Sequence, residues 1–369
     1  MASSTWILRL DEPGTGPRVA IKDLIDLAGT PTTCGSAVVA ATAQPAAADA
    51  ACMAGLRAAD VAIVGKANLH ELACGGSGVN EWFGTPTNPF DPGCLPGGSS
   101  SGSAVALADG EVEIALGSDT AGSIRTPSAW CGTAGLKTTW GRIPVEGTWP
   151  LSPSLDSIGP MARDVAGVIA GMALLEPGFE AAPMASPVIG RVRLPEIIDP
   201  VLEAATDDLL ARSELEVVEI ELPGWEAAVQ AGWTVMFHEV FLSDGHLDVA
   251  GLGADVRERI EEGREVPAAD YAAARAHRDV WRAELAAALD RAPVLAWPTV
   301  LSLPPRFDEP MVGTRITNIP VNLAGHPSLA MPIPRPGERF PASVQLMGAD
   351  AREDLLCATG LVLEAASRS

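Results

Sequence analysis

The sequence predicts an α/β fold in which helices cover a β-sheet. Short apolar runs of strand length alternate with longer segments of helical composition along most of the chain. Residues 188–222 read as a strand, a helix and a second strand, which is the order of a βαβ unit. With 369 residues, 47% of them hydrophobic, the chain can fill one large domain of this class or two smaller ones.

The first part of the chain places a helix between two strands and then a long loop. Residues 18–22 form a short apolar strand that ends at Lys22, an unusual residue to close a buried strand. A helix is expected over residues 46–59 and the next strand over 61–64. Residues 75–103 are dominated by Gly, Pro, Asn and Ser, and a long ordered loop inside a compact domain is usually functional.

Further elements are expected to follow that loop in order. Residues 103–108 are predicted as a helix with serine at its start, 114–116 as a strand and 117–122 as a tight backbone passage. Later helices are expected over residues 162–175, 199–212, 225–242, 267–289 and 353–365, and later strands over 188–194, 214–222, 293–297 and 342–347, with an apolar segment broken by Gly and Pro at 318–331.

The composition argues against several functional classes. The net charge of -22 opposes binding to a phosphate backbone or an anionic membrane surface. The N-terminus lacks a basic region followed by a long apolar run, and no stretch reaches roughly 18 uninterrupted apolar residues. We therefore expect a cytoplasmic protein without a nucleic-acid or membrane partner. The six cysteines include no C-x-x-C pair and the five histidines no close ligand spacing, so we expect free buried thiols, no metal and no cofactor.

Two Gly/Ser loops carry the strongest chemical signal. They cover residues 97–103 and 117–125, and they contain Ser99 and Ser123. A serine nucleophile needs backbone N–H groups that face a developing oxyanion, and small residues before it allow that backbone to approach the substrate closely. The Thr-Ala-Gly-Ser sequence of residues 120–123 supplies such a passage.

The nucleophile also needs a base, because a protonated serine hydroxyl attacks poorly. Neither loop contains a histidine, which argues against a Ser-His-Asp arrangement. Lysine can take this role if burial lowers its pKa toward neutrality. Lys22 on its apolar strand is the leading candidate, and Lys66 and Lys137 are alternatives.

Several segments resemble the amidase signature family of hydrolases. Residues 97–143 resemble the long Gly- and Ser-rich signature itself. Other landmarks of the family match in order at residues 19–24, 65–71, 84–89, 322–327 and 344–348, so the resemblance spans residues 18–365. It implies a single amidase-signature domain over residues 1–369, with a mixed central β-sheet covered by helices on both faces. It divides that domain into a catalytic core at 18–165, a shortened variable region at 166–292 and a C-terminal return at 293–369.

The resemblance also implies catalytic roles. Ser123 matches the family's nucleophile, Ser99 its bridging serine and Lys22 its base, and the peptide bond between Gly98 and Ser99 is expected to be cis. The implied oxyanion hole consists of the backbone N–H groups of Thr120, Ala121, Gly122 and Ser123. Ala121 stands where many members have glycine, which requires a negative φ at that position. Asp119 and Arg125 match flanking positions with an expected structural role.

The activity implied by the resemblance is hydrolysis of a small or medium neutral amide through an acyl-enzyme. The expected partner is this small-molecule substrate, and a homodimer is one assembly that we consider. A urea- or carbamate-type hydrolase, similar to allophanate hydrolase, is an alternative that needs an arginine such as Arg306 or Arg315 for the substrate carboxylate. A glutaminase-like subunit of an amidotransferase complex is another. The expected substrate-binding residues are Cys74, Gly75, Trp82, Trp149 and Arg315.

Overall fold

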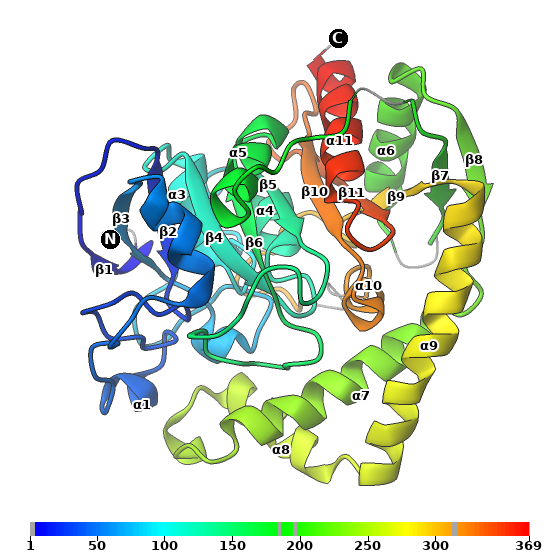
Figure 1. Ribbon diagram of the computed structural model, residues 1–369. Coiled ribbons are helices and arrows are strands. Elements are labelled where there is room, and N and C mark those ends of the chain that lie inside the picture. Colours follow the sequence, from blue (N-terminus) through cyan, green and yellow to red (C-terminus); the bar gives the residue numbers. More distant parts are fainter. Residues whose placement is uncertain (1–3, 184–185, 195–197, 312–315, 369) are drawn as a thin grey trace.

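A computed structural model describes residues 4–183, 186–194, 198–311 and 316–368, through which an eleven-stranded sheet runs (Figure 1). The strands are β1 (Trp6–Arg9), β2 (Arg18–Lys22), β3 (Ala62–Ala67), β4 (Ile114–Asp119), β5 (Ala134–Lys137), β6 (Ser157–Ala162), β7 (Ile189–Val192), β8 (Val217–Ile220), β9 (Val294–Pro298), β10 (Ser328–Ile333) and β11 (Ala342–Gly348). The α-helices are α1 (Ala37–Ala40), α2 (Ala54–Ala58), α3 (Ser101–Ala108), α4 (Arg125–Cys131), α5 (Val165–Leu175), α6 (Pro200–Arg212), α7 (Trp225–Asp244), α8 (Ala254–Glu265), α9 (Ala268–Arg291), α10 (Ile319–Ala324) and α11 (Glu353–Arg368), with short 3₁₀ turns η1 (Ala51–Met53), η2 (Glu71–Ala73) and η3 (Val249–Gly251).

The sheet is mixed, as the family resemblance implies. Its strand order is β1-β3-β2-β4-β6-β5-β10-β11-β9-β7-β8. Strand β2 runs parallel to β3 and β4, and β7 runs parallel to β8 and β9, whereas the other pairs are antiparallel. Strand β2, which ends at Lys22, is therefore a direct neighbour of β4, which leads into the second Gly/Ser loop. The carboxyl ends of these two parallel strands meet at one edge of the sheet.

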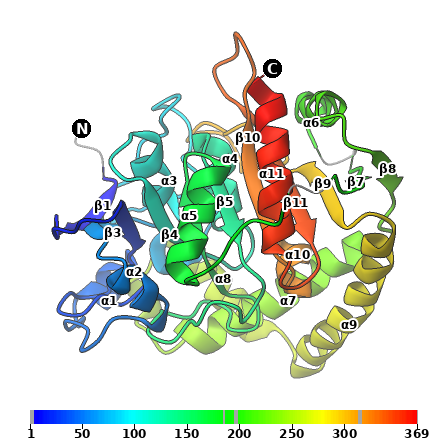
Figure 2. The ribbon, with the colours of Figure 1, turned by 45° about the horizontal axis from the view of Figure 1, so that its top comes forward.

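Both faces of the sheet are covered, because successive side chains of a strand point to opposite sides. On β2, Val19 and Ile21 belong to the larger core, which includes Val165 of α5. Ala20 between them belongs to a second core, which includes Ala104 of α3. Figure 2 shows α5 and α11 side by side on one face.

Helices α7, α8 and α9 form a further layer, which lies at the bottom and lower right of Figure 1. Glu239 on α7 accepts hydrogen bonds from Ser152 Oγ (2.7 Å) and Ser154 Oγ (2.6 Å), in the loop between β5 and β6. That loop leads to Ser157, which pairs with Asp119 at the end of β4. The helical layer thus covers the edge of the sheet at which β4 ends.

Several predicted elements are confirmed. Strand β2 has the predicted bounds, and β7, α6 and β8 form the predicted βαβ unit with parallel strands. The predicted loop follows the turn η2. Between η2 and α3 the described chain contains no strand or α-helix. Helix α5 begins at an N-cap, Asp164, whose side chain accepts from the Gly167 N–H (2.8 Å) and so satisfies a free backbone donor of the first turn.

Other predictions are corrected by tertiary pairing. The helix expected at 46–59 begins only at Ala51, because Pro45 and Ala46 bridge to Pro31 and Ala28 in extended conformation. The expected tight passage at 117–122 is strand up to Asp119, because those residues pair with β6. Strand β6 itself was not predicted, since Gly and Pro within its sequence are disfavoured in strands.

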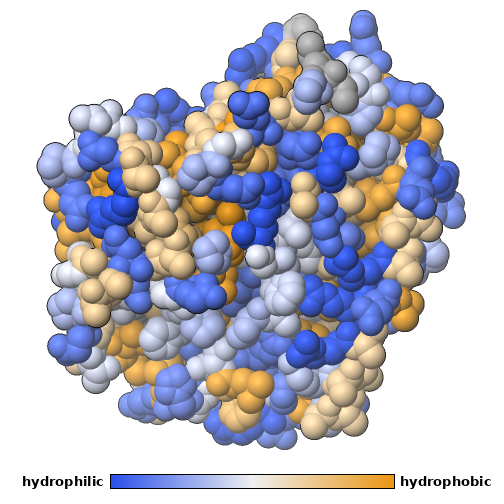
Figure 3. Space-filling view, viewed as in Figure 1, coloured by the Kyte–Doolittle hydropathy of each residue, from blue (hydrophilic) through white to orange (hydrophobic). Residues whose placement is uncertain are grey.

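One face of the molecule is largely polar at its surface. Figure 3 shows hydrophilic residues over much of the visible face, with apolar residues in scattered patches. Within residues 4–368, apart from the gaps given above, no helix is long and apolar enough to cross a membrane. All six cysteines are free and buried, as the sequence predicts.

Candidate active site

Lys22 reaches both serine-bearing segments from the end of β2. Its Nζ donates hydrogen bonds to Ser99 Oγ (2.7 Å) and to Ser118 Oγ (2.8 Å). The side chains of Lys22 and Ser99 are fully buried. Ser118 was not predicted as a partner of Lys22. The signal that could have indicated it is its position on β4, which pairs in parallel with β2. The structure therefore holds the predicted base between the two Gly/Ser loops.

The two loops also meet through their backbones. The peptide bond between Gly98 and Ser99 is cis, as the resemblance implies. Ser99 O accepts from the His70 N–H (3.0 Å), and Ser123 O accepts from the Ser100 N–H (3.1 Å). Ser123 is fully buried, and its Oγ has no hydrogen-bond partner among the described residues. The structure thus joins Lys22 directly to Ser99 and brings in Ser123 through the backbone.

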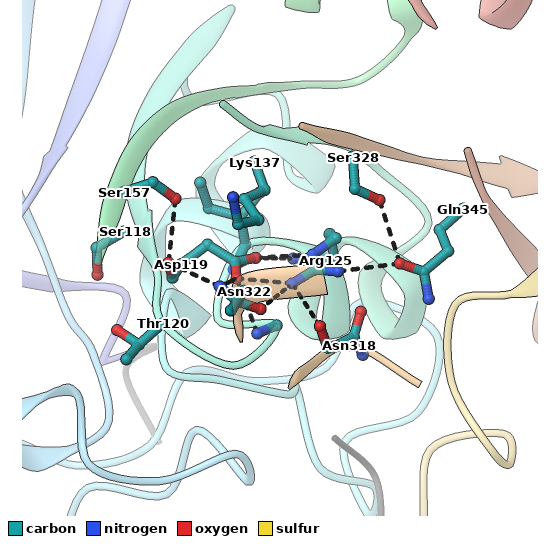
Figure 4. Close-up of polar contacts among 12 residues, drawn as sticks. Ser118, Asp119, Thr120, Arg125, Lys137, Ser157, Asn318, Asn322, Ser328 and Gln345 are labelled. Carbon is teal, nitrogen blue, oxygen red and sulfur yellow. Dashed lines mark hydrogen bonds and ion pairs between the residues drawn. The ribbon is translucent and has the colours of Figure 1, made fainter. Parts of the chain in front are cut away.

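The Asp119 carboxylate fixes the turn that leads to Ser123 (Figure 4). It accepts from the backbone N–H groups of Gly122 (2.8 Å) and Ile124 (3.1 Å), and from Arg125 Nε (3.0 Å) and Nη2 (2.9 Å). Burial alone raises the pKa of Asp119, but the adjacent Arg125 guanidinium holds it well below its usual range. The carboxylate therefore stays charged and acts structurally, as expected for both residues.

This arrangement bears on one member of the implied oxyanion hole, which itself stays a prediction. The Gly122 N–H is directed at Asp119 Oδ1, so it is taken by the carboxylate. Thr120, Ala121 and Ser123 remain as implied donors. The φ angle of Ala121 is not positive, so alanine fits at this position without backbone strain. Gly122 has a φ of 102°, and an added Cβ would lie 2.8 Å from Asn318, so only glycine fits.

Segments from the far end of the chain complete the support of this turn. Arg125 Nη1 donates to Gln345 Oε1 on β11 (3.0 Å), and Asn322 Nδ2 on α10 donates to Asp119 Oδ1 (2.8 Å). Figure 4 shows these side chains converging on Asp119 and Arg125. The predicted landmarks around residues 322–327 and 344–348 therefore support the turn that leads to Ser123.

The two alternative lysines have other partners. Lys66 forms a buried ion pair with Asp23 (2.9 Å). Lys137 Nζ donates to Thr138 O (2.8 Å) and His326 O (2.9 Å), and burial, together with the nearby Arg125, lowers its pKa to about 7. Of the three candidate lysines, Lys22 is the one with a hydrogen bond to a loop serine within the described structure.

Two acids beyond the turn that leads to Ser123, the half-buried Asp156 and the buried Asp244, were missed by sequence reasoning. Thr120 Oγ1 donates to Asp156 Oδ1 (2.6 Å), and burial raises the pKa of Asp156 to about 6. Burial, reinforced by Asp156 and Glu71, raises the pKa of Asp244 to about 7. Asp244 Oδ2 has no hydrogen-bond partner among the described residues. Because these acids lie far from the loops in sequence, no local pattern indicates them.

The predicted substrate residues Cys74 and Gly75 lie on a loop that contacts Ser99. Cys74 is buried, and its carbonyl oxygen accepts from Arg259 Nη1 on α8 (3.1 Å). Gly75 packs so closely on His70 that an added Cβ would lie 2.0 Å from Nε2. Since the His70 N–H binds Ser99 O, this loop adjoins the bridging serine.

The remaining predicted substrate residues are more scattered. Trp149 Nε1 donates to Asp244 Oδ1 (2.9 Å), and Trp149 lines a cavity of about 590 Å³ with Thr32 and His246. Trp82 is 43% exposed at the surface. Arg315 lies outside the described residues. Arg306, the other arginine considered, packs against Gly93 at the surface and pairs with Asp308.

Comparison with known proteins decides the family. The amidase family model matches residues 12–357. This chain belongs to the amidase family. Its similarity to a deaminase and to a peptide amidase supports an amide-hydrolysing enzyme with a fold of this class, as the sequence resemblance implies.

The chain aligns with amidase relatives of different stated activities. It is 35% identical to the 2-amino-5-chloromuconic acid deaminase of Comamonas testosteroni, over 96% of this chain and 82% of that protein. It is 32% identical to one of the subunits of the Glutamyl-tRNA(Gln) amidotransferase of Akkermansia muciniphila, over 96% of this chain and 87% of that protein. The peptide amidase structure from Stenotrophomonas maltophilia superposes with a TM-score of 0.81 at 28% identity, over 98% of this chain and 84% of that one.

Proposed function

We propose that this amidase cleaves a small or medium neutral amide with Ser123 as nucleophile, Ser99 as proton relay and Lys22 as base. The observation that carries the proposal is the 2.7 Å contact between Lys22 Nζ and Ser99 Oγ, in a fully buried site joined to Ser123 through Ser100. Burial of all three side chains excludes bulk water, which strengthens the electrostatic interactions among them.

Proton transfer begins at Lys22. In its neutral form, the amine accepts the Ser99 hydroxyl proton while one of its own N–H bonds donates to Ser118 Oγ. Ser99 then accepts the proton of Ser123, whose oxygen attacks the amide carbonyl. The Ser99–Ser123 contact has to form as substrate binds, and catalytic hydrogen bonds often tighten only in that complex. The proton returns through Ser99 to the leaving amine, and water then hydrolyses the acyl-enzyme.

The developing oxyanion is stabilised by the backbone N–H groups of Thr120, Ala121 and Ser123. Asp119 holds this turn rigid, so the donors need little reorganisation during the reaction. The Thr120 hydroxyl is held by Asp156. The acidic side chains of Asp156 and Asp244 beyond the turn favour a neutral substrate over an anionic one.

A serine-directed fluorophosphonate tests the nucleophile. We expect a single adduct on Ser123, located by peptide mass spectrometry, because an activated hydroxyl beside oxyanion donors is what this reagent traps. The Ser123→Ala variant should lose both labelling and amide hydrolysis, whereas Ser101→Ala, which removes another buried loop hydroxyl without a partner, should keep both. An adduct on any other residue overturns the assignment.

Two of the relatives each suggest an alternative function. The deaminase relative is named for an acid, which favours a carboxylate-bearing substrate, a feature that the urea- or carbamate-type alternative shares. The amidotransferase relative favours a glutaminase that works with a partner protein. A panel of neutral amides, their carboxylate analogues, ureas and glutamine, assayed on the isolated chain, separates the three. The proposal requires the highest kcat/KM on a neutral amide.

A further inference from the structure

A large cavity lies between α7, α9 and the loop that joins β5 to β6. Its volume is about 830 Å³, which is within the range of small-molecule sites. Much of its wall is apolar or aromatic, formed by Trp140, Pro150, Pro153, Leu242 and Tyr271. Trp140 and Leu242 are 43% and 62% exposed, so they are accessible to a ligand in the cavity. None of the three proposed catalytic residues lines the cavity.

One arginine lies in this wall, and a second, Arg278, lies outside the lining but contacts two of its residues, in a chain whose net charge is -22. Arg275 lines the cavity and lies over the Tyr271 ring (5.8 Å). Arg278 lies over the Trp140 ring (5.0 Å) and donates to Ser154 O (3.4 Å). Among the described residues, neither arginine forms an ion pair with a carboxylate, although most other arginines of the structure do. His246 lines the same cavity.

The one acid in the wall does not offset these cations toward the opening. Glu239 is 4% exposed. Its carboxylate accepts from Ser152 Oγ, from the N–H and Oγ of Ser154, and from the Tyr271 hydroxyl, all within 3.0 Å. Both oxygens of the Glu239 carboxylate are therefore already hydrogen-bonded within the protein. The Tyr271 hydroxyl donates its hydrogen bond to Glu239, so its oxygen is free to accept one from Arg275 Nη1 (3.2 Å). This contact orients the guanidinium at the cavity wall.

We propose that this cavity is a second ligand site, which binds a small aromatic carboxylate. The aromatic ring packs against Trp140 and the two prolines, and the carboxylate pairs with the guanidinium groups of Arg275 and Arg278. A planar guanidinium binds a carboxylate through paired hydrogen bonds, and an aromatic ring gains from burial against apolar walls. The site is separate from the catalytic serines and does not depend on their assigned roles.

The test is a calorimetric titration of the full chain with 2-naphthoate. We expect saturable binding, and at least ~10-fold weaker binding for Arg275→Gln and for Arg278→Gln, since each removes a charge-assisted contact. Arg291→Gln, at the far end of the same helix, is the matched control and should bind as the unmodified protein does. The uncharged analogue 2-naphthylmethanol should bind at least ~10-fold more weakly than 2-naphthoate.

Binding to the catalytic site is distinguished by the Ser123→Ala variant and by protein blocked with fluorophosphonate. Both should bind 2-naphthoate with unchanged affinity. Loss of binding in the blocked protein places the ligand at the catalytic serines and overturns the proposal. Equal affinity of Arg275→Gln, Arg278→Gln and the unmodified protein also overturns it. Arg275 is exposed on α9, so its replacement is expected to leave the fold intact, which an unchanged melting temperature would verify.

Discussion

Ser118 shows how a single hydroxyl orients the proposed base. Lys22 Nζ lies 2.7 Å from Ser99 Oγ and 2.8 Å from Ser118 Oγ, so the amine has two fixed neighbours on different segments. Because β2 and β4 are parallel neighbours, the position of Ser118 relative to Lys22 is set by regular strand pairing rather than by a flexible loop. A base held by rigid elements keeps the geometry that proton transfer requires.

Asp244 provides a residue-scale prediction about stability and pH. Burial raises the pKa of this carboxyl to about 7 from an ordinary value of 3.8, so the folded protein binds more protons than the unfolded chain between these values. Stability therefore falls as pH rises through that range, by up to about 4 kcal/mol. Asp244→Asn removes this dependence, so we expect its melting temperature to exceed that of the unmodified protein at about pH 8 and to match it at about pH 4.

Thermal melts at both pH values check this prediction. The exposed Asp248, four residues further along the chain, supplies the control: Asp248→Asn should change the melting temperature little at either pH. An Asp244→Asn protein that differs from the unmodified one by the same amount at both pH values would contradict the account of a buried, raised carboxyl.

The predicted catalytic residues come from segments with a long local pattern, and their roles stay a prediction. The two Gly/Ser loops and the strand that ends at Lys22 place Lys22, Ser99 and Ser123, which the structure brings together. The oxyanion set also stays a prediction, and within it the Gly122 N–H is taken by Asp119. Asp156 and Asp244 could not be found from the sequence, because they approach the site only through the folding of distant segments.

Helix α8 holds the loop beside the bridging serine. Glu71 Oε2 accepts from the Gly253 N–H (2.8 Å), His70 Nε2 lies 3.0 Å from Asp255 Oδ2, and Arg259 donates to Cys74 O. The loop contains two consecutive left-handed residues, Leu72 (φ 52°) and Ala73 (φ 57°), a conformation that costs free energy and persists only under external support. Contacts from α8 supply part of that support.

The element-scale prediction follows from this contact. Asp255→Asn weakens the bond to His70 by removing the charge of its acceptor, and it also weakens the bond from Arg259. We expect kcat on a neutral amide to fall by about 10-fold, since small displacements near reacting groups reduce rates strongly. Glu258→Gln, an exposed change on the same helix, is the control for general effects on α8. Steady-state kinetics in which both variants match the unmodified enzyme would show that the contact is dispensable.

Element prediction failed for identifiable reasons. Helix α8 is mostly charged, and only Val256, Ile260 and Gly263 on one face are buried, so its apolar signal is weak. Strand β6 contains Gly and Pro, and it is stabilised by pairing with both β4 and β5 rather than by its own propensity. By contrast, β2, β11 and the βαβ unit were predicted within a few residues.

The site depends on the molecule as a whole. Lys22 comes from the first strands, the serines from the middle of the core, and Asn322 and Gln345 from the last third of the chain. The eleven-stranded sheet carries these segments, and the helices α7 to α9 cover its edge. Family resemblance predicted this plan because its landmarks are spread along residues 18–365, whereas the domain bounds inside it stay a prediction.

The whole-molecule prediction concerns autonomy. Among the described residues, no group of three or more His, Cys, Asp or Glu side chains is arranged to hold a metal ion. We predict that EDTA leaves the rate of amide hydrolysis unchanged. As a separate expectation of the proposed function, the purified chain hydrolyses a neutral amide without a partner protein. Ammonia or amine release is the measurement. Activity that appears only after a second protein is added, or that EDTA abolishes and a metal restores, would contradict this view.

The most direct test of the proposed mechanism is the hydrolysis of a neutral amide and its matched activated ester by Lys22→Ala. The lysine takes a proton before attack and returns it to the leaving group. An amine needs that proton in the transition state, whereas a good alkoxide leaving group does not. We predict a loss of at least ~100-fold in kcat/KM on the amide and a clearly smaller loss on the ester. Near-full amide activity, or equal losses on both substrates, would contradict the Ser-Ser-Lys mechanism.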